Sequence, residues 1–562
     1  MQNVYTDTRT LDRAAVSRFG LTEDILMENA ACALESEVVR ACTDRAADIR
    51  VNCSPVPEYR VLIVAGGGDN GGDGWALARR LNGRTAAGLP CSVTVLEVVA
   101  PKSQACMRQA ERARSAGVPV IRNFSRTDFI KNYHLIVDCI FGSGFHGSLS
   151  AQIEKLIAAL NKADCFKIAC DIPSGIDSKG AGTSAFRADV TVCMGALKTA
   201  LFGDFAKNHT RKIITAPLGI PSSLFESGEK SEKNAEAAEP AQISAAAEPV
   251  APAAFGSEMP AAFLLEASDM RLPERFLPSV HKGDFGHAAV YTGEKPGAGI
   301  IAACAAFRCG AGLVSLVSSA GQSAPAVKAG QNALPPYAIP PYLMQSSVLP
   351  EKASAVAAGM GFGRNDDRGA AERAAELFAV LNEKRKLSCV LDADLFYHAD
   401  IKQVIKARPS GLVLTPHPKE FQSLLSLCGL GTVSVEQIVE NRLELVKDFC
   451  STYPGAVLLL KGANMAIGYC PEKGGKQKGG KAEVYINTFG MPCLAKGGSG
   501  DVLAGLVCAF LAQKYEPLDA AIQGSLLLAA SSRLQKSSYS STPFTLIQSL
   551  EEPEKLKKAL EG

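Results

Sequence analysis

Short apolar runs, most of them ending at a glycine or an aspartate, recur along the first 225 residues of the chain. They are too short for buried helices and suit strands that are buried on both faces of a parallel sheet. Segments between them carry apolar residues at helical spacing, so strands and helices alternate. This alternation predicts a doubly wound sheet whose ligand-binding loops lie at the carboxyl ends of the strands. The expected strands are 60–65, 92–96, 134–138, 166–171 and 190–192, and the expected helices are 75–81 and 105–116.

The same alternation starts again at about residue 263 and predicts a second α/β sheet with helices on both faces. Each apolar run there stops at Gly, Asp, His or Lys, which are the residue types that build a site at a sheet edge. The expected strands are 288–291, 355–358, 389–391, 412–414 and 457–460, and the expected helices are 299–309 and 501–512.

A segment of different composition separates the two patterns. Residues 226–260 consist mainly of Ala, Glu, Pro and Ser, with Ile243 and Phe255 as the only large aliphatic or aromatic side chains. Such a segment buries too little apolar surface to offset the entropy of ordering, which predicts a flexible linker. A charged surface helix is the alternative for 229–238 only, because prolines interrupt the rest. The predicted organisation is therefore a domain at 1–225, a linker at 226–262 and a domain at 263–562.

Composition and charge exclude several classes of protein. The formal net charge is +2 and no block of Lys and Arg stands out, so we expect no nucleic-acid partner. No apolar stretch is long enough to span a membrane, and the first twelve residues lack the apolar core of a signal peptide. The 17 cysteines form no CxxC pair, which favours reduced thiols in a cytoplasmic protein.

A glycine-rich segment, GGGDNGGDG at 66–74, follows the first strand. It contains a literal GxGxxG pattern, so a dinucleotide-binding loop is one interpretation, but a lone match is weak. It is no Walker A loop, because no Gly-Lys-Ser/Thr follows. Asp69, Asn70 and Asp73 stand between the glycines, and carboxylates would repel a bare pyrophosphate. These side chains are therefore expected to serve a cationic or hydroxylated group.

Two later strands end in loops that supply further oxygen groups. Asp138 ends one strand, and Asp171 begins the segment DIPSGID that ends the next. Oxygens of Asn70, Asp138 and Ser174 would together form a hard-oxygen site for a weakly charged cation. The alternative is that Asp138 and Ser174 only brace turns.

These motifs, with VDCIFGSGFHG, GALKT, APLGIP and the helix at 27–30, make residues 10–221 resemble the NAD(P)H-hydrate epimerase family. The resemblance implies a Rossmann-like domain that inverts C6 of hydrated NADH and NADPH (NADHX and NADPHX) and that holds potassium at Asn70, Asp138 and Ser174. Family members usually have Asn where this chain has Asp69. Inversion requires proton transfer, for which Asp171 is the candidate, with Lys198 either its charge partner or a plain surface or phosphate-contacting lysine. The hydrate would contact Asp69, Asn70, Gly71, Gly72, Asp73, Gly142, Ser143, Gly144, Phe145, His146, Gly147, Ser148 and Asp171.

The segment AKGGSGDVLAG at 495–505 carries the strongest motif of the chain. Consecutive glycines that open an apolar helix expose backbone N–H groups, and the helix dipole favours an anion there. Asp501 at the start of this helix can accept a proton from an attacking hydroxyl, which is the arrangement that phosphoryl transfer needs. A capping aspartate after a glycine-rich turn is the structural alternative.

Together with HKGDFG, GMGFG, DAD, TPHPKE and LKGA, this motif makes residues 265–535 resemble the ADP-dependent NAD(P)H-hydrate dehydratase family. The resemblance implies a ribokinase-like domain that binds magnesium with ADP, with Asp392, Asp394 or Glu420 as candidate outer ligands. Family members usually have Thr where this chain has Met465. The hydrate would contact Ala298, Gly361 or Gly363, His417 and Asp501, and the nucleotide would contact Lys461, Gly462, Ala463, Asn464, Met465 and Gly500.

The implied reaction activates a poor leaving group. Asp501 would deprotonate the C6 hydroxyl, which attacks the β-phosphate of ADP and releases AMP. The ring nitrogen then expels phosphate and restores the dihydronicotinamide. The alternatives are a sugar or vitamin-precursor kinase with an accessory Rossmann-like domain, and a front domain that only binds a ligand. We also expect a homo-oligomer.

Overall fold

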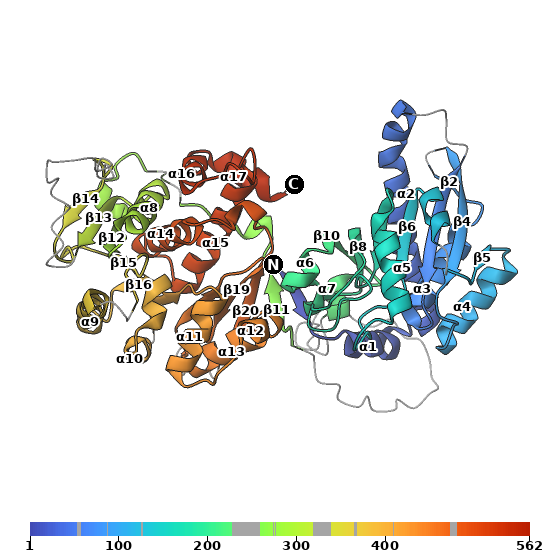
Figure 1. The fold of residues 1–562 in the computed structure, drawn as a ribbon, viewed down its shortest axis with the longest axis horizontal. Coiled ribbons are helices and arrows are strands. Elements are labelled where there is room, and N and C mark those ends of the chain that lie inside the picture. The colour runs from blue at the N-terminus through green and yellow to red at the C-terminus, as the bar shows by residue number, and fades with distance from the viewer. Residues whose placement is uncertain are drawn as a thin grey trace, which may run out of the picture. The chain divides into compact units, whose positions relative to one another are not determined.

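The protein is described from a computed structural model, which covers residues 1–52, 58–86, 88–124, 127–226, 259–273, 275, 277–318, 339–364, 368–408, 410–472 and 480–561. Its contacts divide the chain into two compact units, Asn3–Ala261 and Met1–Gln2 with Ala262–Gly562 (Figure 1). Most of the expected linker, including the alternative helix at 229–238, lies outside the described residues.

The N-terminal unit contains a parallel sheet in the order β10-β8-β7-β6-β2-β4-β5, and β3 is antiparallel to β4. From β2 the chain first adds strands on one side and then returns to β6 on the other, so the order reverses between β2 and β6. In addition, β1 pairs with β9 in parallel, which places Tyr5 opposite Lys198. The strands are β1 (Gln2–Tyr5), β2 (Tyr59–Ala65), β3 (Thr85–Ala86), β4 (Leu89–Glu97), β5 (Val120–Ile121), β6 (Leu135–Cys139), β7 (Phe166–Cys170), β8 (Ala188–Met194), β9 (Leu197–Lys198) and β10 (Thr210–Ala216).

Helices cover both faces of this sheet. One face packs against α2, α3 and α4, with the indole of Trp75 fully buried among them, and the other packs against α5. The doubly wound prediction is thus confirmed. The helices are α1 (Arg9–Phe19), α2 (Glu23–Asn52), α3 (Asp69–Leu81), α4 (Gln104–Ser115), α5 (Ala151–Lys162), α6 (Asp204–Lys207) and α7 (Ser222–Glu226), with 3₁₀ turns η1 (Asp128–Asn132) and η2 (Thr199–Phe202).

The C-terminal unit has a longer sheet in the order β14-β13-β12-β15-β16-β17-β18-β19-β20-β11. Its pairs are parallel except those that β19 makes with β18 and β20, and the strand order reverses between β12 and β15. The strands are β11 (Ala262–Leu264), β12 (His287–Thr292), β13 (Leu313–Ser318), β14 (Met344–Ser346), β15 (Ala355–Ala358), β16 (Ser388–Leu391), β17 (Leu412–Leu414), β18 (Val457–Leu460), β19 (Met465–Tyr469) and β20 (Glu483–Asn487).

Two apolar helices, α8 and α14, pack side by side on one face of this sheet (Figure 1). A Cβ at Gly505 would lie 2.1 Å from the carbonyl oxygen of Ala302, so only glycine allows this close approach. The helices are α8 (Pro296–Arg308), α9 (Arg368–Glu383), α10 (Ile401–Ala407), α11 (Pro418–Cys428), α12 (Val435–Glu440), α13 (Arg442–Thr452), α14 (Ser499–Ala512), α15 (Pro517–Arg533), α16 (Pro543–Gln548) and α17 (Pro553–Glu561), with 3₁₀ turns η3 (Ala267–Asp269), η4 (Lys282–Phe285), η5 (Ala393–Tyr397), η6 (Pro492–Leu494) and η7 (Ser549–Glu551).

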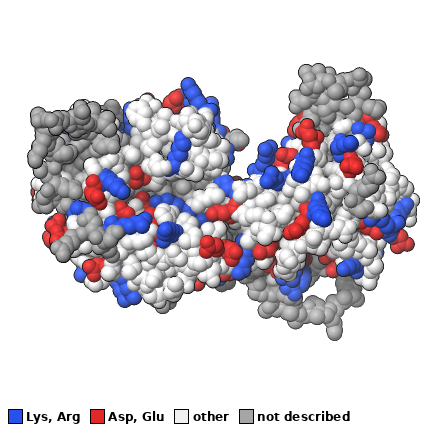
Figure 2. Space-filling view, viewed as in Figure 1, with Lys and Arg blue, Asp and Glu red and all other residues white. Residues whose placement is uncertain are grey.

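Surface charge and cysteines agree with the composition. On the face in Figure 2, basic and acidic side chains are interspersed over both units. The sixteen cysteines in the described part are free thiols, and all but Cys32 and Cys304 are buried. None of the described helices is long and apolar enough to cross a membrane.

Candidate active sites

The first candidate site lies where the strand order reverses between β2 and β6, because loops that leave in opposite directions open a crevice there. The segment that we expected as a loop is helical from Asp69 onward, so Asp69, Asn70 and Asp73 belong to the first turns of α3. A Cβ at Gly66 would lie 1.9 Å from the carbonyl oxygen of Ile140. Glycine therefore lets the start of α3 approach the end of β6.

Asp138 and Ser174 are in direct contact at this edge. The Ser174 hydroxyl donates to Asp138 Oδ1 at 2.7 Å, and the backbone N–H of Ser174 donates to Oδ2 at 2.8 Å. Both residues are buried. Burial raises the pKa of Asp138 to about 6, although the N–H groups of Ser174 and Ile140 act in the opposite direction.

Asp171 and Lys198 form a buried ion pair. Lys198 Nζ lies 2.6 Å from Asp171 Oδ1 and also donates to the carbonyl oxygen of Met194 at 2.9 Å. Burial lowers the pKa of Lys198, but the Asp171 carboxylate, together with smaller contributions from Cys193 and Asp12, raises it overall. Asp171 has φ 65°, a left-handed conformation that costs a non-glycine residue energy and is typical of functional sites. Lys198 is therefore a charge partner and not a surface lysine.

The loop after β6 brings further predicted residues to Asp171. The backbone N–H of Ser143 donates to Asp171 Oδ2 at 3.2 Å. A Cβ at Gly142 would lie 3.3 Å from both Asn70 Oδ1 and Asp171 Oδ2, so these groups surround Gly142. Phe145 is half-buried, and the remaining predicted residues of this loop lie exposed along its rim: Gly144, His146, Gly147 and Ser148.

Two more carboxyls share this site. Burial raises the pKa of Asp73 well above its usual range, and the neighbouring Asp171 and Asp69 add to the shift, so the site favours the protonated form of Asp73. Burial also raises the pKa of Asp12 to about 6, against the effect of Lys198. Asp12 lies on α1, and no motif in the sequence marks it. The pairing of β1 with β9 brings the start of the chain to Lys198.

The oxygen groups at this edge fit a monovalent cation. The buried Asp138 makes no ion pair with a described Lys or Arg, so its neighbours leave its negative charge uncompensated. The Oδ1 atom of Asn70 lies 3.3 Å from the position that a Cβ at Gly142 would take, in the loop after β6. A neutral amide, a hydroxyl and one carboxylate suit a weakly charged ion.

The second candidate site lies at the carboxyl ends of the strands in the C-terminal unit. Its centre is the start of α14, which follows Gly498 in the left-handed conformation at φ 92°. A Cβ at Gly500 would lie 3.2 Å from Lys461 Nζ, so the first turn of α14 faces this lysine. Lys461 Nζ in turn lies 2.6 Å from Asp392 Oδ1, and both side chains are largely buried.

Asp501, on the same turn, has a strongly perturbed acidity. Burial raises its pKa to about 7, the carboxylate of Asp392 adds to the shift, and Lys461 opposes it. Asp394 and Glu420 contribute in the same direction as Asp392. A carboxyl that titrates near neutral pH is suited to accept and return a proton.

Residues after β12 and β15 complete this edge. Gly361 and Gly363 both have positive φ, at 64° and 91°. A Cβ at Gly361 would lie 3.3 Å from Ala298 Cβ, and the N–H of Gly363 donates to Asp394 Oδ2 at 2.9 Å. The structure therefore brings three of the predicted hydrate contacts, Ala298, Gly361 and Gly363, to one strand edge.

The turn between β18 and β19 carries Lys461, Gly462, Ala463 and Asn464, and a buried arginine that the sequence did not mark holds it. Arg442 donates to the carbonyl oxygens of Asn464 and Lys461 at 2.8 and 3.2 Å. A Cβ at Gly462 would lie 2.0 Å from its guanidinium, so Arg442 fills the space that glycine leaves. Arg442 thus positions Lys461.

Two predicted contacts have structural tasks instead of facing freely into the site. Nδ1 of His417 accepts the N–H groups of Lys419 and Glu420, and Nε2 lies 3.0 Å from Glu420 Oε1, so the ring caps α11. The side chain of Met465 packs in the hydrophobic core, which leaves only its backbone for a ligand.

The acidic groups around Lys461 fit a divalent cation that arrives with a polyphosphate. Asp392, Glu420 and Asp501 interact with Lys461, and Asp394 lies 3.9 Å from Arg364, so these four carboxyls outnumber the two cations and negative charge is in excess. Among the described residues, no three His, Cys, Asp or Glu side chains are close enough to hold a metal ion on their own. Magnesium typically takes few protein ligands and several phosphate and water oxygens.

Comparisons with known proteins cover both units. A family model described as NAD(P)H-hydrate dehydratase matches residues 289–552, and one described as YjeF-related protein N-terminus matches residues 23–200. The bifunctional NAD(P)H-hydrate repair enzyme Nnr of Helicobacter pylori is 38% identical over 98% of this chain and 100% of its own length. The proteins of that name from Moorella thermoacetica and Escherichia coli are 30% and 28% identical, over 92% and 82% of this chain and 89% and 78% of theirs. Among solved structures, a ribokinase-like superfamily protein from Enterococcus faecalis is 21% identical with a TM-score of 0.41, over 53% of this chain and 96% of that one.

The perturbed carboxyl of Asp501 predicts a pH-dependent gain in stability on substitution. Its folded-state pKa of about 7 lies above the ordinary value, so the folded state binds more protons than the unfolded state, and Asp501 destabilises the fold increasingly from about pH 4 to pH 7. Asp501→Asn should therefore raise the melting temperature by a few degrees at pH 8 and by less at pH 5. Calorimetry at the two pH values measures this, and an equal gain at both would contradict the raised pKa.

Proposed function

Since this chain belongs to the family of bifunctional NAD(P)H-hydrate repair enzymes, we propose that its two units repair hydrated NADH and NADPH in two steps. The N-terminal unit interconverts the R and S epimers at C6, and the C-terminal unit dehydrates the S epimer with ADP. The observation that carries the proposal is Asp501, a carboxyl with a pKa of about 7 in the first turn of an apolar helix and beside a buried lysine.

In the epimerase site, Asp171 is the base and Asp73 is the acid. The hydrate carries a hydroxyl on C6, next to the ring nitrogen, so removal of the hydroxyl proton allows the C6–N bond to open and to re-form on the other face. Lys198 binds and orients the carboxyl group of Asp171 that accepts this proton. Asp73, whose protonated form is favoured by burial, can donate a proton to the ring nitrogen. Asp69, Asn70, Gly71 and Gly72 line the start of α3 and would contact the hydrate.

Potassium fits the same edge as a structural and electrostatic partner. Asn70, Asp138 and Ser174 would hold it, and a bound cation would neutralise the buried Asp138 and attract the anionic substrate.

In the dehydratase site, Asp501 takes the proton of the C6 hydroxyl. The oxygen then bonds to the β-phosphorus of ADP, the bond from that phosphorus to the bridging oxygen breaks, and AMP leaves. The ring nitrogen expels the phosphate from C6, and loss of a C5 proton restores the dihydronicotinamide. Backbone N–H groups from Gly497 to Gly500 and the ammonium of Lys461 stabilise the transferred phosphoryl group. Magnesium would neutralise the phosphates, with Asp392, Asp394 or Glu420 as outer ligands.

A small-molecule kinase with a non-catalytic front domain has less support, because the similarity to repair enzymes extends over both units. Homo-oligomerisation and a cytoplasmic location stay predictions of the sequence.

Asp501→Asn tests the dehydratase assignment. We expect it to lower ADP-dependent formation of NADH from the S hydrate about 100-fold or more, the contribution of a general base, while interconversion of the epimers is unchanged. Absorbance of the reduced cofactor reports the first rate and chromatography of the hydrates the second. A variant that keeps most of its dehydratase rate would rule out Asp501 as the base.

The potassium site predicts a cation requirement that is confined to epimerisation. Asp138→Ala should abolish the dependence on potassium and slow epimerisation, with ADP-dependent dehydration unaffected. The interconversion rate is compared in potassium, sodium and tetramethylammonium buffers for both proteins. Equal rates in all three buffers, together with an unimpaired variant, would leave Asp138 as a turn brace.

A further inference from the structure

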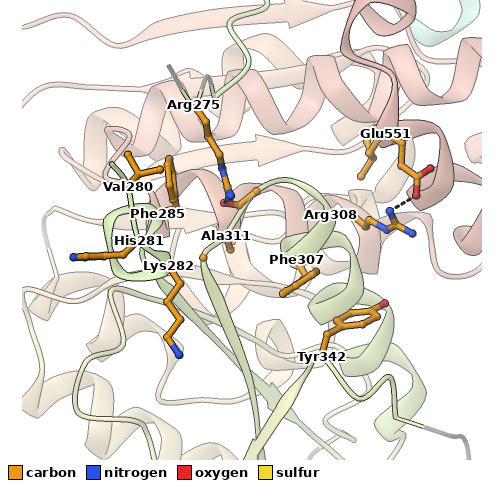
Figure 3. Close-up of a pocket in the computed structure, with 13 residues that line it drawn as sticks. Arg275, Val280, His281, Lys282, Phe285, Phe307, Arg308, Ala311, Tyr342 and Glu551 are labelled. Atoms are coloured by element: carbon orange, nitrogen blue, oxygen red, sulfur yellow. Dashed lines mark hydrogen bonds and ion pairs between the residues drawn. The ribbon is translucent and has the colours of Figure 1, made fainter. Parts of the chain in front are cut away.

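A cavity of about 830 Å³ opens in the C-terminal unit, away from the strand edge that carries Asp501 (Figure 3). It is lined by η4, the end of α8 and the residues just before β13, all of which lie at the amino ends of β12 and β13. Ala298 at the start of α8 belongs to the catalytic edge, whereas Arg308 at its end lines the cavity. Thirteen residues of helix separate the two ends by about 20 Å, so the cavity is distinct from the active site.

Aromatic rings form part of the cavity wall. Tyr342 stacks on Phe307 with ring centroids 4.6 Å apart, and Tyr342 remains 43% exposed, so one face of the stack is open. On the other side of the opening, Arg275 lies over the ring of Phe285 at 3.9 Å (Figure 3). Such a wall suits a planar base, which every nucleotide carries.

The charged groups of the cavity favour an anion. Arg275, Lys282 and Arg308 line it, and the carboxylate of Glu551 pairs with Arg308. The three cations that line the cavity outnumber the one lining carboxylate, that of Glu551, so positive charge is in excess. Arginine and lysine are the residues that bind phosphate most often.

We propose that this cavity is a second nucleotide site, in which a base stacks on Tyr342 and the phosphates bind Arg275 and Arg308. Its volume lies within the range of about 300–1,000 Å³ that small-molecule sites occupy. A purely structural role for Arg275 explains less of the arrangement of charged and aromatic side chains around the cavity. Arg275 donates to the carbonyl oxygen of Gly310 at 2.8 Å and so binds the turn that follows α8, but one such bond uses only one of its five N–H groups.

Equilibrium dialysis of the intact protein with radiolabelled ADP tests the proposal. Wild type should bind two ADP per chain, one at each site. Arg275→Gln and Arg308→Gln should each weaken the second site about tenfold or more, as expected for loss of a charge-assisted hydrogen bond, and Arg385→Gln, at an exposed arginine outside the cavity, should not. Lys461→Met should remove ADP binding at the catalytic site and leave ADP binding at the cavity. This variant therefore distinguishes failure of this proposal from failure of the proposed function.

Glu551→Gln gives a test of opposite sign. Loss of the carboxylate frees Arg308 and removes repulsion of a phosphate, so ADP should bind the cavity several-fold more tightly than in wild type. A residue with only a structural role would not show this gain. The proposal would be overturned if wild type bound only one ADP per chain and Lys461→Met abolished that binding. Wild type that bound no ADP at all would overturn it too. The proposal would also be overturned if the protein self-associated in sedimentation and Arg308→Gln disrupted the association. In that case a second copy of the chain would cover the cavity.

Discussion

In each unit, a buried lysine forms an ion pair with an aspartate where several carboxyl groups gather at the carboxyl ends of parallel strands. Lys198 holds Asp171 in the N-terminal unit, and Lys461 holds Asp392 in the C-terminal unit. Burying a charge is costly unless it is paired, so each ion pair lets charged groups stay buried at its site. Burial raises the pKa of neighbouring carboxyls, that of Asp73 well above its usual range and that of Asp501 to about 7. The different chemical roles of otherwise similar aspartates follow from these differences in environment.

The backbone around each pair is arranged to keep it in place. Asp171 adopts a left-handed conformation that orients its carboxylate toward Lys198, and the N–H of Ser143 binds its other oxygen. Arg442 performs the corresponding task for Lys461 by binding both ends of its turn. The two activities then complement each other chemically, since hydration yields both epimers and a site that accepts one of them requires the other to be converted.

Much of the fold follows from the sequence, because strands buried on both faces must be apolar throughout. The predicted bounds of 355–358, 412–414 and 457–460 coincide with those of β15, β17 and β18. The segment 66–74 was expected to be a loop, whereas α3 already begins at Asp69. A helix that starts with glycines leaves no periodic apolar signal in its first turns. Asp12 and Arg442 were missed because their burial depends on contacts distant in sequence, and the tasks of His417 and Met465 emerge only from packing.

The most direct test of two complementary activities on one chain uses a mixture of both hydrate epimers with ADP, followed by the absorbance of NADH until the signal is constant. Wild type should convert the whole mixture. Asp171→Asn should convert rapidly only the fraction present as the S epimer, and the remainder should follow at the slow spontaneous rate of epimerisation. Rapid and complete conversion by Asp171→Asn, or conversion by wild type without ADP, would contradict the account.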